Sequence, residues 1–189
     1  MSKTATRSKI MPIVLYGESV LETPGAPVTR FDAELRELVD DMFSTMYAAQ
    51  GVGLAAPQVG VSKRISVIDV SFKEDPKAKI VIINPEIIRK EGKQVGQEGC
   101  LSIPDFRENV TRANSVTVRA QDAHGEWFEA SGDGLLARAF QHEIDHLDGK
   151  LFLFHLSALK RDLIKRKIKK LRLSGDWPPS ITPGSKPRK

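Results

Sequence analysis

Two histidines and a glutamate stand close enough together in this chain to bind a metal ion and activate water on it. The run is His142-Glu-Ile-Asp-His146. On a helix, its two imidazoles lie one turn apart on the same face, so both can reach one divalent cation. Glu143 is rotated off that line, where it can take a proton from water. Chance predicts roughly 0.005 such matches in a chain of this composition, so we favour a hydrolytic metal site over two ordinary surface histidines.

A catalytic site of this kind needs a third protein ligand and an open position for water. Glu143 is the last glutamate in the chain, which excludes peptidases that take a glutamate from a later helix. Phe152 stands where other peptidases carry a third histidine, so that class is excluded too. Among residues after the motif, His155 and Asp162 remain as poor but open alternatives.

The single cysteine, Cys100, is a better candidate for the third ligand. It lies in Gln97-Glu-Gly-Cys-Leu-Ser102, where Gly99 allows the backbone to approach a metal closely. A solitary cysteine is more often a small buried apolar residue, and only the incomplete histidine pair favours a ligand here. A thiolate, two imidazoles and a water would complete a tetrahedral site.

Apolar periodicity predicts the helices that position these groups. The motif helix should run from about Gly134 to Leu147, an earlier helix from the N-cap Asp32 to Gly51, and a third from about Leu156 to Leu173. Short apolar runs predict strands at residues 64–70, 79–84, 86–89, 115–120, 127–130 and 151–154. We expect an α+β fold in which antiparallel sheets pack around the helix that bears the motif, with an N-terminal helix and a basic C-terminal helix.

Basic charge is concentrated at the C-terminal end. The chain has a net charge of +5, yet residues 160–172 carry eight Lys and Arg against one Asp. The third helix should therefore pair a solvated basic surface with an apolar stripe made of Leu156, Leu159, Leu163, Ile164, Ile168 and Leu171. We expect residues 1–173 to form one domain and residues 174–189, which offer little to bury, to be a disordered tail.

Composition excludes several other classes of protein. One cysteine rules out a disulfide framework and favours a reducing compartment. No stretch approaches the roughly 18 apolar residues that span a bilayer, and no secretory signal opens the chain. With 2 Trp and 2 Tyr, the aromatic platforms of many RNA-binding proteins are missing. We expect a cytoplasmic protein with neither a membrane nor a specific DNA partner.

Three segments together resemble the signature motifs of the peptide deformylases. They are Gly51-Val-Gly-Leu-Ala-Ala-Pro-Gln58, Glu98-Gly-Cys-Leu-Ser102 and Gln141-His-Glu-Ile-Asp-His146, in the family's order and at similar separations. The resemblance covers about Ile10 to Leu173. It implies an α+β metallohydrolase that removes the N-terminal formyl group from formyl-methionyl nascent polypeptides and releases formate. It also implies one divalent metal, usually Fe(II), for which Zn, Ni or Co can substitute.

The same resemblance implies the residues that perform the reaction. Cys100, His142 and His146 would hold the metal, on which a hydroxide attacks the formyl carbon. Glu143 would act as general base and then as general acid. Glu98, Asp145 and Arg112 are candidates for orienting the ligands, although the sequence does not say which of them pair.

The oxyanion and substrate contacts also follow from the resemblance. The side-chain amide of Gln58 and the backbone N–H of Leu101 would donate hydrogen bonds to the formyl oxygen as it gains negative charge. The residues expected near the peptide are Val52, Gly53, Gly99, Arg107 and Arg138.

Two other interpretations remain open from the sequence. The first is another metallopeptidase or amidohydrolase with the same His-Glu-x-x-His motif. The second is a basic RNA-binding or scaffolding protein led by the third helix, although residues 1–159 carry more acidic than basic side chains. By resemblance to the deformylases, that helix would instead dock the enzyme on ribosomal RNA.

Overall fold

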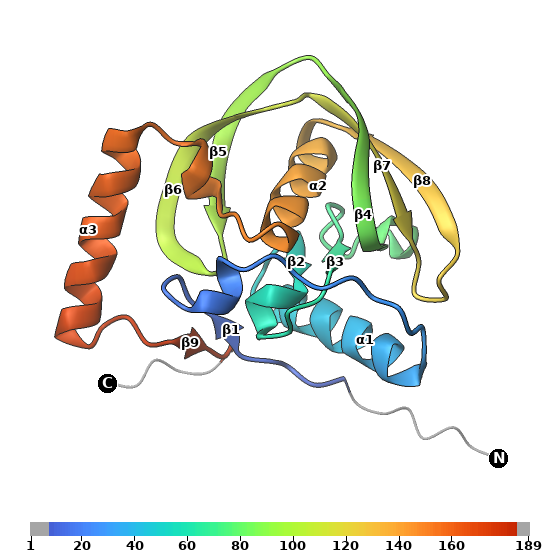
Figure 1. The fold of residues 1–189 in the computed structure, drawn as a ribbon, viewed down its shortest axis with the longest axis horizontal. Helices are drawn as coiled ribbons and strands as arrows, with labels where there is room; N and C mark the ends of the chain where they lie inside the picture. The colour runs from blue at the N-terminus through green and yellow to red at the C-terminus, as the bar shows by residue number, and fades with distance from the viewer. Residues whose placement is uncertain (1–7, 185–189) are drawn as a thin grey trace.

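The computed structural model describes residues 8–184, which form an α+β fold with three antiparallel sheets (Figure 1). The five-stranded sheet has the order β2 (Gly53–Ala55), β3 (Ile65–Ile68), β4 (Ile80–Glu91), β7 (Ser115–Gln121) and β8 (Trp127–Asp133). The two-stranded sheets pair β5 (Gln94–Cys100) with β6 (Ile103–Arg112) and β1 (Ile13–Val14) with β9 (Ser180–Ile181). The helices are α1 (Ala33–Ala48), α2 (Gly134–Leu147) and α3 (Ala158–Ser174), and the 3-10 turns are η1 (Ser19–Leu21), η2 (Ala56–Val59), η3 (Pro76–Ala78) and η4 (Phe152–His155).

Helix α1 begins as its sequence predicts. The Asp32 carboxylate accepts a hydrogen bond from the backbone N–H of Leu35 at 3.0 Å, which satisfies one of the free donors of the first turn. Its apolar face, including Met42 and Met46, packs in one core cluster with Leu54 of β2 and residues of β3. That cluster also contains Ala56 and Val59, so it holds β2 and η2, the elements formed by the glycine-rich motif, in place beside the site.

Helix α2 lies between the β5–β6 hairpin and the strands β4, β7 and β8 (Figure 1). Ala137, Phe140 and Ile144 on one face pack against the five-stranded sheet. Gly149, with φ +70°, follows the helix in the left-handed conformation that glycine adopts readily. The sheet thus fixes the rotation of α2, and with it the direction of the two motif histidines.

The strand predictions need three corrections. The β5–β6 hairpin was not predicted, because β5 is rich in Gly, Gln and Glu and lacks alternating apolar residues. Residues 79–84 and 86–89 belong to one strand, β4, whose pairing with β7 shifts register between Ile83 and Glu86. Residues 152–154 of the strand predicted at 151–154 belong instead to the 3-10 turn η4.

Helix α3 forms where expected, but its buried stripe is narrower than predicted. Ile164 and Ile168 are its buried residues, whereas the side chains of Leu159 and Leu163 are exposed. The reason is that α3 lies at the left edge of the fold in Figure 1, so that only the side with Ile164 and Ile168 is buried. Among the described residues, no helix combines the length and apolar character needed to cross a membrane.

Residues 174–184, which belong to the predicted tail, include a buried tryptophan and a short strand. Trp177 is buried in the core cluster beneath α3, and its indole N–H donates to the carbonyl of Tyr16 at 3.0 Å. Strand β9 follows and pairs with β1, so that Ile181 lies opposite Ile13. Residues 185–189 of the predicted tail lie outside the described residues.

Candidate active site

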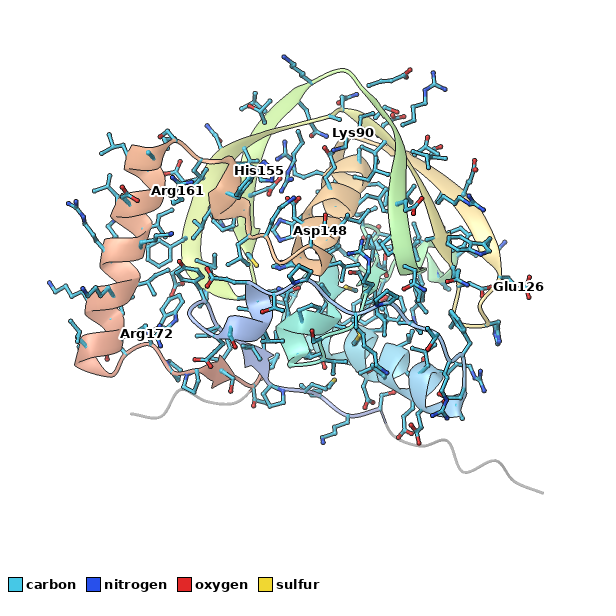
Figure 2. The ribbon with its side chains drawn as sticks, in the orientation of Figure 1. Lys90, Glu126, Asp148, His155, Arg161 and Arg172 are labelled. Atoms are coloured by element: carbon cyan, nitrogen blue, oxygen red, sulfur yellow. The ribbon has the colours of Figure 1, made fainter. Side chains whose placement is uncertain are left out.

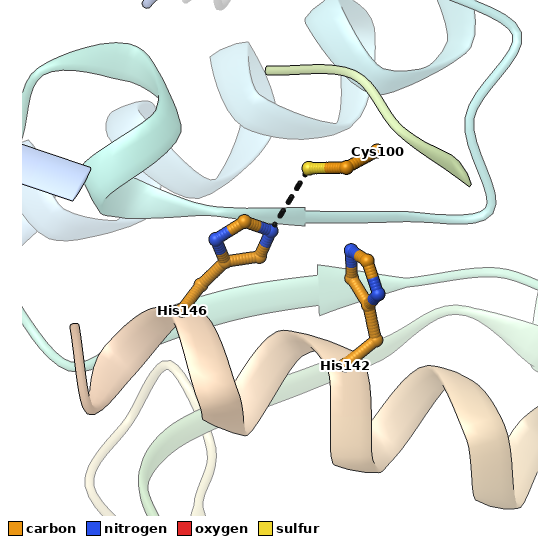
Figure 3. A group of neighbouring side chains, drawn as sticks. All are labelled: Cys100, His142 and His146. Carbon is orange, nitrogen blue, oxygen red and sulfur yellow. Dashed lines mark hydrogen bonds between the residues drawn. The ribbon is translucent and has the colours of Figure 1, made fainter. Parts of the chain in front are cut away.

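A thiol and two imidazoles meet beside α2 (Figure 3). One ligand atom from each of Cys100, His142 and His146 lies within 4.8 Å of the others. Cys100 ends strand β5, and the histidines project from successive turns of α2 with ring centroids 4.9 Å apart. The distance from Cys100 Sγ to His146 Nε2 is 3.3 Å. The alternative ligands His155 and Asp162 do not belong to this cluster.

The charges of the cluster stabilise a thiolate. Burial opposes ionisation of Cys100, but the charges of His146 and His142, and their hydrogen bonds to sulfur, outweigh it and lower the thiol pKa to about 5. Burial also opposes the charged form of His142, yet hydrogen bonds to Cys100 and Glu98 raise its pKa well above the usual value. A thiolate with two imidazoles is a donor set that suits Fe(II), Zn and related cations, so these residues fit a divalent metal.

Glu143 lies beside this cluster without a complete set of partners. Its side chain is buried, and Oε2 has no hydrogen-bond partner among the described residues. Burial, partly offset by the nearby histidines, raises the pKa of this carboxyl to about 7. A side chain at Gly53 would collide with the Glu143 carboxylate, so the glycine of β2 is required for this approach. The result is a proton acceptor held next to the three donors.

The side-chain amide nitrogen of Gln58 faces the cluster of Cys100, His142 and His146. Its Oε1 accepts a hydrogen bond from the backbone N–H of Ala55 at 2.9 Å, which orients the side chain. Its Nε2 then lies 3.2 Å from Ser102 Oγ and 3.5 Å from Cys100 Sγ. A surface amide would be solvated, whereas Gln58 is buried with its donor directed at the cluster.

A buried ion-pair network contacts the His142 ring at Nδ1. Arg112 donates to both Glu98 oxygens at 2.8 and 2.9 Å, and Glu98 Oε2 lies 3.1 Å from His142 Nδ1. Burial alone would raise the pKa of Glu98, but these hydrogen bonds and charges hold it well below the usual range. Since Nδ1 of His142 faces the carboxylate, Nε2 is left for a ligand bond.

The network continues to the protein surface. Arg112 Nη1 donates to Asp145 Oδ2 at 2.6 Å, and His155 Nε2 lies 2.7 Å from the same oxygen. The three residues expected to orient the ligands, Glu98, Asp145 and Arg112, are therefore joined in one chain of contacts. His155 extends that chain at the outer end, where Figure 2 shows it beside α2.

Arg138 has a different environment from a solvated helix residue. It is buried, and its Nη1 donates to Glu98 Oε1 at 2.7 Å and to the carbonyl of Val110 at 3.1 Å. The sequence predicted a substrate contact for Arg138. Its guanidinium is bound to the hairpin, and the residue also lines the cavity described next.

A cavity of about 650 Å³ opens onto the cluster. The predicted site residues that line it are Val52, Gly53, Gln58, Gly99, Cys100, Leu101, Arg107, Arg138, His142 and Glu143. His146 is nearly fully buried behind them. The sequence missed Ile103, Phe106, Leu135 and Phe72 as lining residues, as well as residues 181, 183 and 184. Phe72, Leu135 and Ile181 of this group are exposed apolar residues, but their exposure cannot be read from the sequence.

The fold and this site define a class of protein, the α+β metal-dependent hydrolases in which one helix carries the His-Glu-x-x-His pattern. The Polypeptide deformylase family model matches residues 10–162. The peptide deformylase of Acidobacterium capsulatum is 64% identical over 168 residues, which cover 89% of this chain and 99% of that protein. The chain therefore belongs to the polypeptide deformylase family, and it is a hydrolase that removes N-terminal formyl groups.

Solved structures agree with this assignment. The crystal structure of a peptide deformylase from Legionella pneumophila has a TM-score of 0.81 at 49% identity and covers 89% of this chain and 99% of its own. That of a Synechococcus elongatus peptide deformylase in complex with actinonin has a TM-score of 0.79 at 38% identity, with coverage of 90% and 94%. The predicted α+β fold and enzyme class are confirmed, and the non-enzymatic interpretation is wrong.

Proposed function

We propose that Cys100, His142 and His146 bind one divalent metal, Fe(II) in the cell, with Zn, Ni or Co as substitutes. We further propose that the enzyme releases formate from formyl-methionyl nascent polypeptides in the cytoplasm. The observation that carries this proposal is the convergence of the three donors with the unpartnered Glu143 Oε2 at one cavity. A buried acceptor without a partner among the described residues costs free energy, so its presence at this site favours a role in the reaction.

Glu143 supplies the proton transfers in this proposal. Cys100, His142 and His146 would hold a divalent cation, which would lower the pKa of water near neutral pH and polarise the formyl oxygen. Glu143 Oε2 takes the proton that the attacking water gives up, because it has no competing partner among the described residues. The same oxygen then returns the proton to the departing amine. A pKa raised to about 7 suits both directions of transfer.

The formyl oxygen needs hydrogen-bond donors as it gains negative charge. Gln58 Nε2 is one, since its Oε1 is already fixed by Ala55 and its nitrogen faces the cluster. The backbone N–H of Leu101, at the turn after Cys100, is proposed as the second. Donors held in place before the reaction stabilise the transition state without reorganising.

Selectivity for formyl over acetyl would come from the size of the site. Gly53, Gly99 and the buried carboxylate of Glu143 line the cavity next to the ligands, so an added methyl group would meet protein atoms. We propose that Val52 and the aliphatic part of Arg138 border the slot for the methionine side chain. Arg107, exposed at the cavity, is placed to bind a peptide carbonyl.

The test is anaerobic purification with metal analysis, coupled to formate release from formyl-Met-Ala-Ser and acetyl-Met-Ala-Ser. We expect about one metal ion per chain, turnover of the formyl peptide alone, and loss of activity on chelation that Fe(II) restores. Cys100→Ser should lower the metal content. Equal cleavage of the acetyl peptide, or full metal content in Cys100→Ser, would contradict the proposal.

A second proposed role, docking on ribosomal RNA, is favoured by the charge of α3. Eight of its residues are Lys or Arg, most of them exposed, and Figure 2 shows Arg161 and Arg172 near its opposite ends. The triple variant Lys165→Glu, Lys169→Glu, Lys170→Glu should weaken ribosome binding. The slope of the logarithm of the binding constant against the logarithm of the salt concentration should become shallower by about 1 for each phosphate that is no longer neutralised. Reversal of Lys90 and Lys93, at the turn before β5, is the matched control. Unchanged binding in the α3 variant would exclude this role.

A further inference from the structure

The segment from Trp177 to Gly184, here called the C-terminal strap, is fastened across the N-terminal strand. The Trp177 indole donates to the carbonyl of Tyr16, and its ring packs edge-on against Phe106 with centroids 6.2 Å apart. The backbone N–H of Leu15 donates to the carbonyl of Pro179 at 2.8 Å. Beyond that bond β9 pairs with β1. The strap is therefore held at successive points along its length.

This fastened segment forms part of the cavity that contains the candidate active site. Ile181, Pro183 and Gly184 line that cavity together with Ile103 and Phe106 of β6. Ile181 presents an exposed apolar side chain, and Pro183 is half-buried. The strap thus adds an apolar wall to a cavity whose other end holds Cys100 and Glu143.

The wall lies at a distance from the chemistry. Strand β9 lies at the lower edge of the fold in Figure 1, apart from α2, the helix that carries the histidines. A formyl group bound at the cluster would direct the following residues of an extended peptide outward, at about 3.3 Å per residue. The cavity, at about 650 Å³, is also of the size that holds a drug-sized ligand rather than one residue.

The family match supports treating the strap as a separate contribution. The family model ends at residue 162, so Trp177 to Gly184 lie outside the matched part of the chain. The catalytic cluster and its supporting network lie within it. Because the strap lies outside the residues that the family model matches, it can change which peptides are preferred without changing the residues that perform the reaction.

We propose that the C-terminal strap contacts the nascent peptide beyond its first two residues and favours apolar side chains there. This inference rests on the proposed function and deepens it. Ile181 and Pro183 would be specificity-determining residues, because an apolar peptide side chain gains buried contact against them and an acidic one loses hydration. The reaction at the formyl group would be the same for all peptides.

The test compares kcat/KM for formyl-Met-Ala, formyl-Met-Ala-Leu-Leu and formyl-Met-Ala-Asp-Asp in the full-length metal-loaded enzyme. We expect the Leu-Leu peptide to exceed the Asp-Asp peptide by about tenfold, as one apolar contact in a pocket allows. Ile181→Asn, a polar change without a charge that would repel the acidic peptide, should remove most of that preference, chiefly through KM. Ile181→Val should keep it within about twofold. Pro183→Ser, which lies outside β9, should reduce the preference without disturbing the strand.

The matched control is Leu173→Asn, which makes the same kind of change at an exposed leucine of α3. It should leave the ratio between the two longer peptides unchanged. An unaltered ratio in both Ile181→Asn and Pro183→Ser would overturn the inference, as would an equal loss on all three peptides. If the parent enzyme releases formate from none of them, the proposed function fails as well, so the two failures are distinguishable.

Discussion

Two glutamates on either side of His142 are equally buried and have opposite environments. Glu98 and Glu143 are 4% and 3% exposed. Both oxygens of Glu98 are bound by Arg112, with Arg138 and His142 adding contacts, whereas Oε2 of Glu143 has no partner among the described residues. The pKa of Glu98 is accordingly held well below its usual range, and that of Glu143 is raised to about 7. Burial by itself raises the pKa of both carboxyls; the partners of Glu98 outweigh that effect, whereas the histidines beside Glu143 offset it only in part.

The difference separates stabilisation from reactivity. Replacing one partner of a satisfied buried ion pair leaves an uncompensated buried charge. Glu98 is therefore needed mainly for the stability of the fold. A buried carboxyl with a free oxygen destabilises the folded state and is retained where its proton exchange is useful. The loss of Glu143 should thus be felt in turnover, and the loss of Glu98 in folding and in metal binding.

The largest effect should follow from Glu143→Gln, which keeps the shape of the side chain and removes the proton acceptor. We expect kcat to fall by about 1,000-fold, within the range that general acid–base groups contribute. Metal content should match that of the parent enzyme, and urea stability should be equal or higher. Formate release and metal analysis are the measurements. A kcat within tenfold of the parent would contradict the role of Glu143.

Glu98→Gln should reverse that pattern. Arg112 and Arg138 would lose a buried counter-charge, and we expect a loss of about 3–5 kcal/mol in the free energy of unfolding. The His142 ring would lose its carboxylate partner, which should weaken metal affinity by about 10–100-fold. Urea unfolding and metal titration measure the two effects. The control is Glu108→Gln on the same hairpin, whose exposed pair with Lys160 should contribute less than about 1 kcal/mol.

The two carboxyls should also differ in how they couple stability to pH in the metal-free protein. The folded pKa of Glu98 lies below the unfolded value of about 4.3, so its stabilisation is present above that pH and is lost as the pH falls. Between pH 5 and pH 3 the parent should lose about 2 kcal/mol more than Glu98→Gln. Glu143 acts in the opposite sense, since its raised pKa makes ionisation costly as the pH rises from about 4 towards 7. Parallel stability curves for parent and Glu98→Gln would refute this assignment.

The smallest effect should come from the outer end of the network. His155→Gln removes one contact to Asp145, which retains its bond to the buried Arg112. The side chains of His155 and Asp145 are 29% and 17% exposed, so solvent screens the pair. We expect a change of less than about 1 kcal/mol in unfolding free energy and less than twofold in kcat. A larger change would show that the His155 contact stabilises the network more than a solvent-screened pair does.

Elements that depend on local sequence were predictable. Helix α2 matches its predicted bounds. Both signals that predict it, the apolar periodicity and the Asp148-Gly149 pair that ends the helix, lie within the same short segment of sequence. Helix α1 is capped by the predicted Asp32 for the same reason. The candidate metal ligands were predictable because two of them share one helix, and the third was the single thiol.

Elements that depend on distant partners were not predictable. The β5–β6 hairpin is held by cross-strand pairing and by the buried Glu98 network, neither of which leaves an apolar pattern in the sequence. Arg138 is indistinguishable from a solvated helix residue until its position opposite Glu98 is known. The tail carries only Trp177 and Ile181 as large apolar residues, and their burial and pairing depend on Tyr16 and Ile13 at the other end of the chain.

The contact between the two ends of the chain also has a kinetic consequence. Trp177 and Tyr16 are 161 residues apart in sequence, so their hydrogen bond closes almost the whole chain into a loop. Contacts of such long range are slow to form, because the chain entropy given up in closing the loop is not recovered until the ends are in place. Helix α2 and the strands around it depend on shorter separations. We expect the part of the cavity around Cys100, His142 and Glu143 to form first during folding. The wall formed by the strap should be the last part of the enzyme to fold.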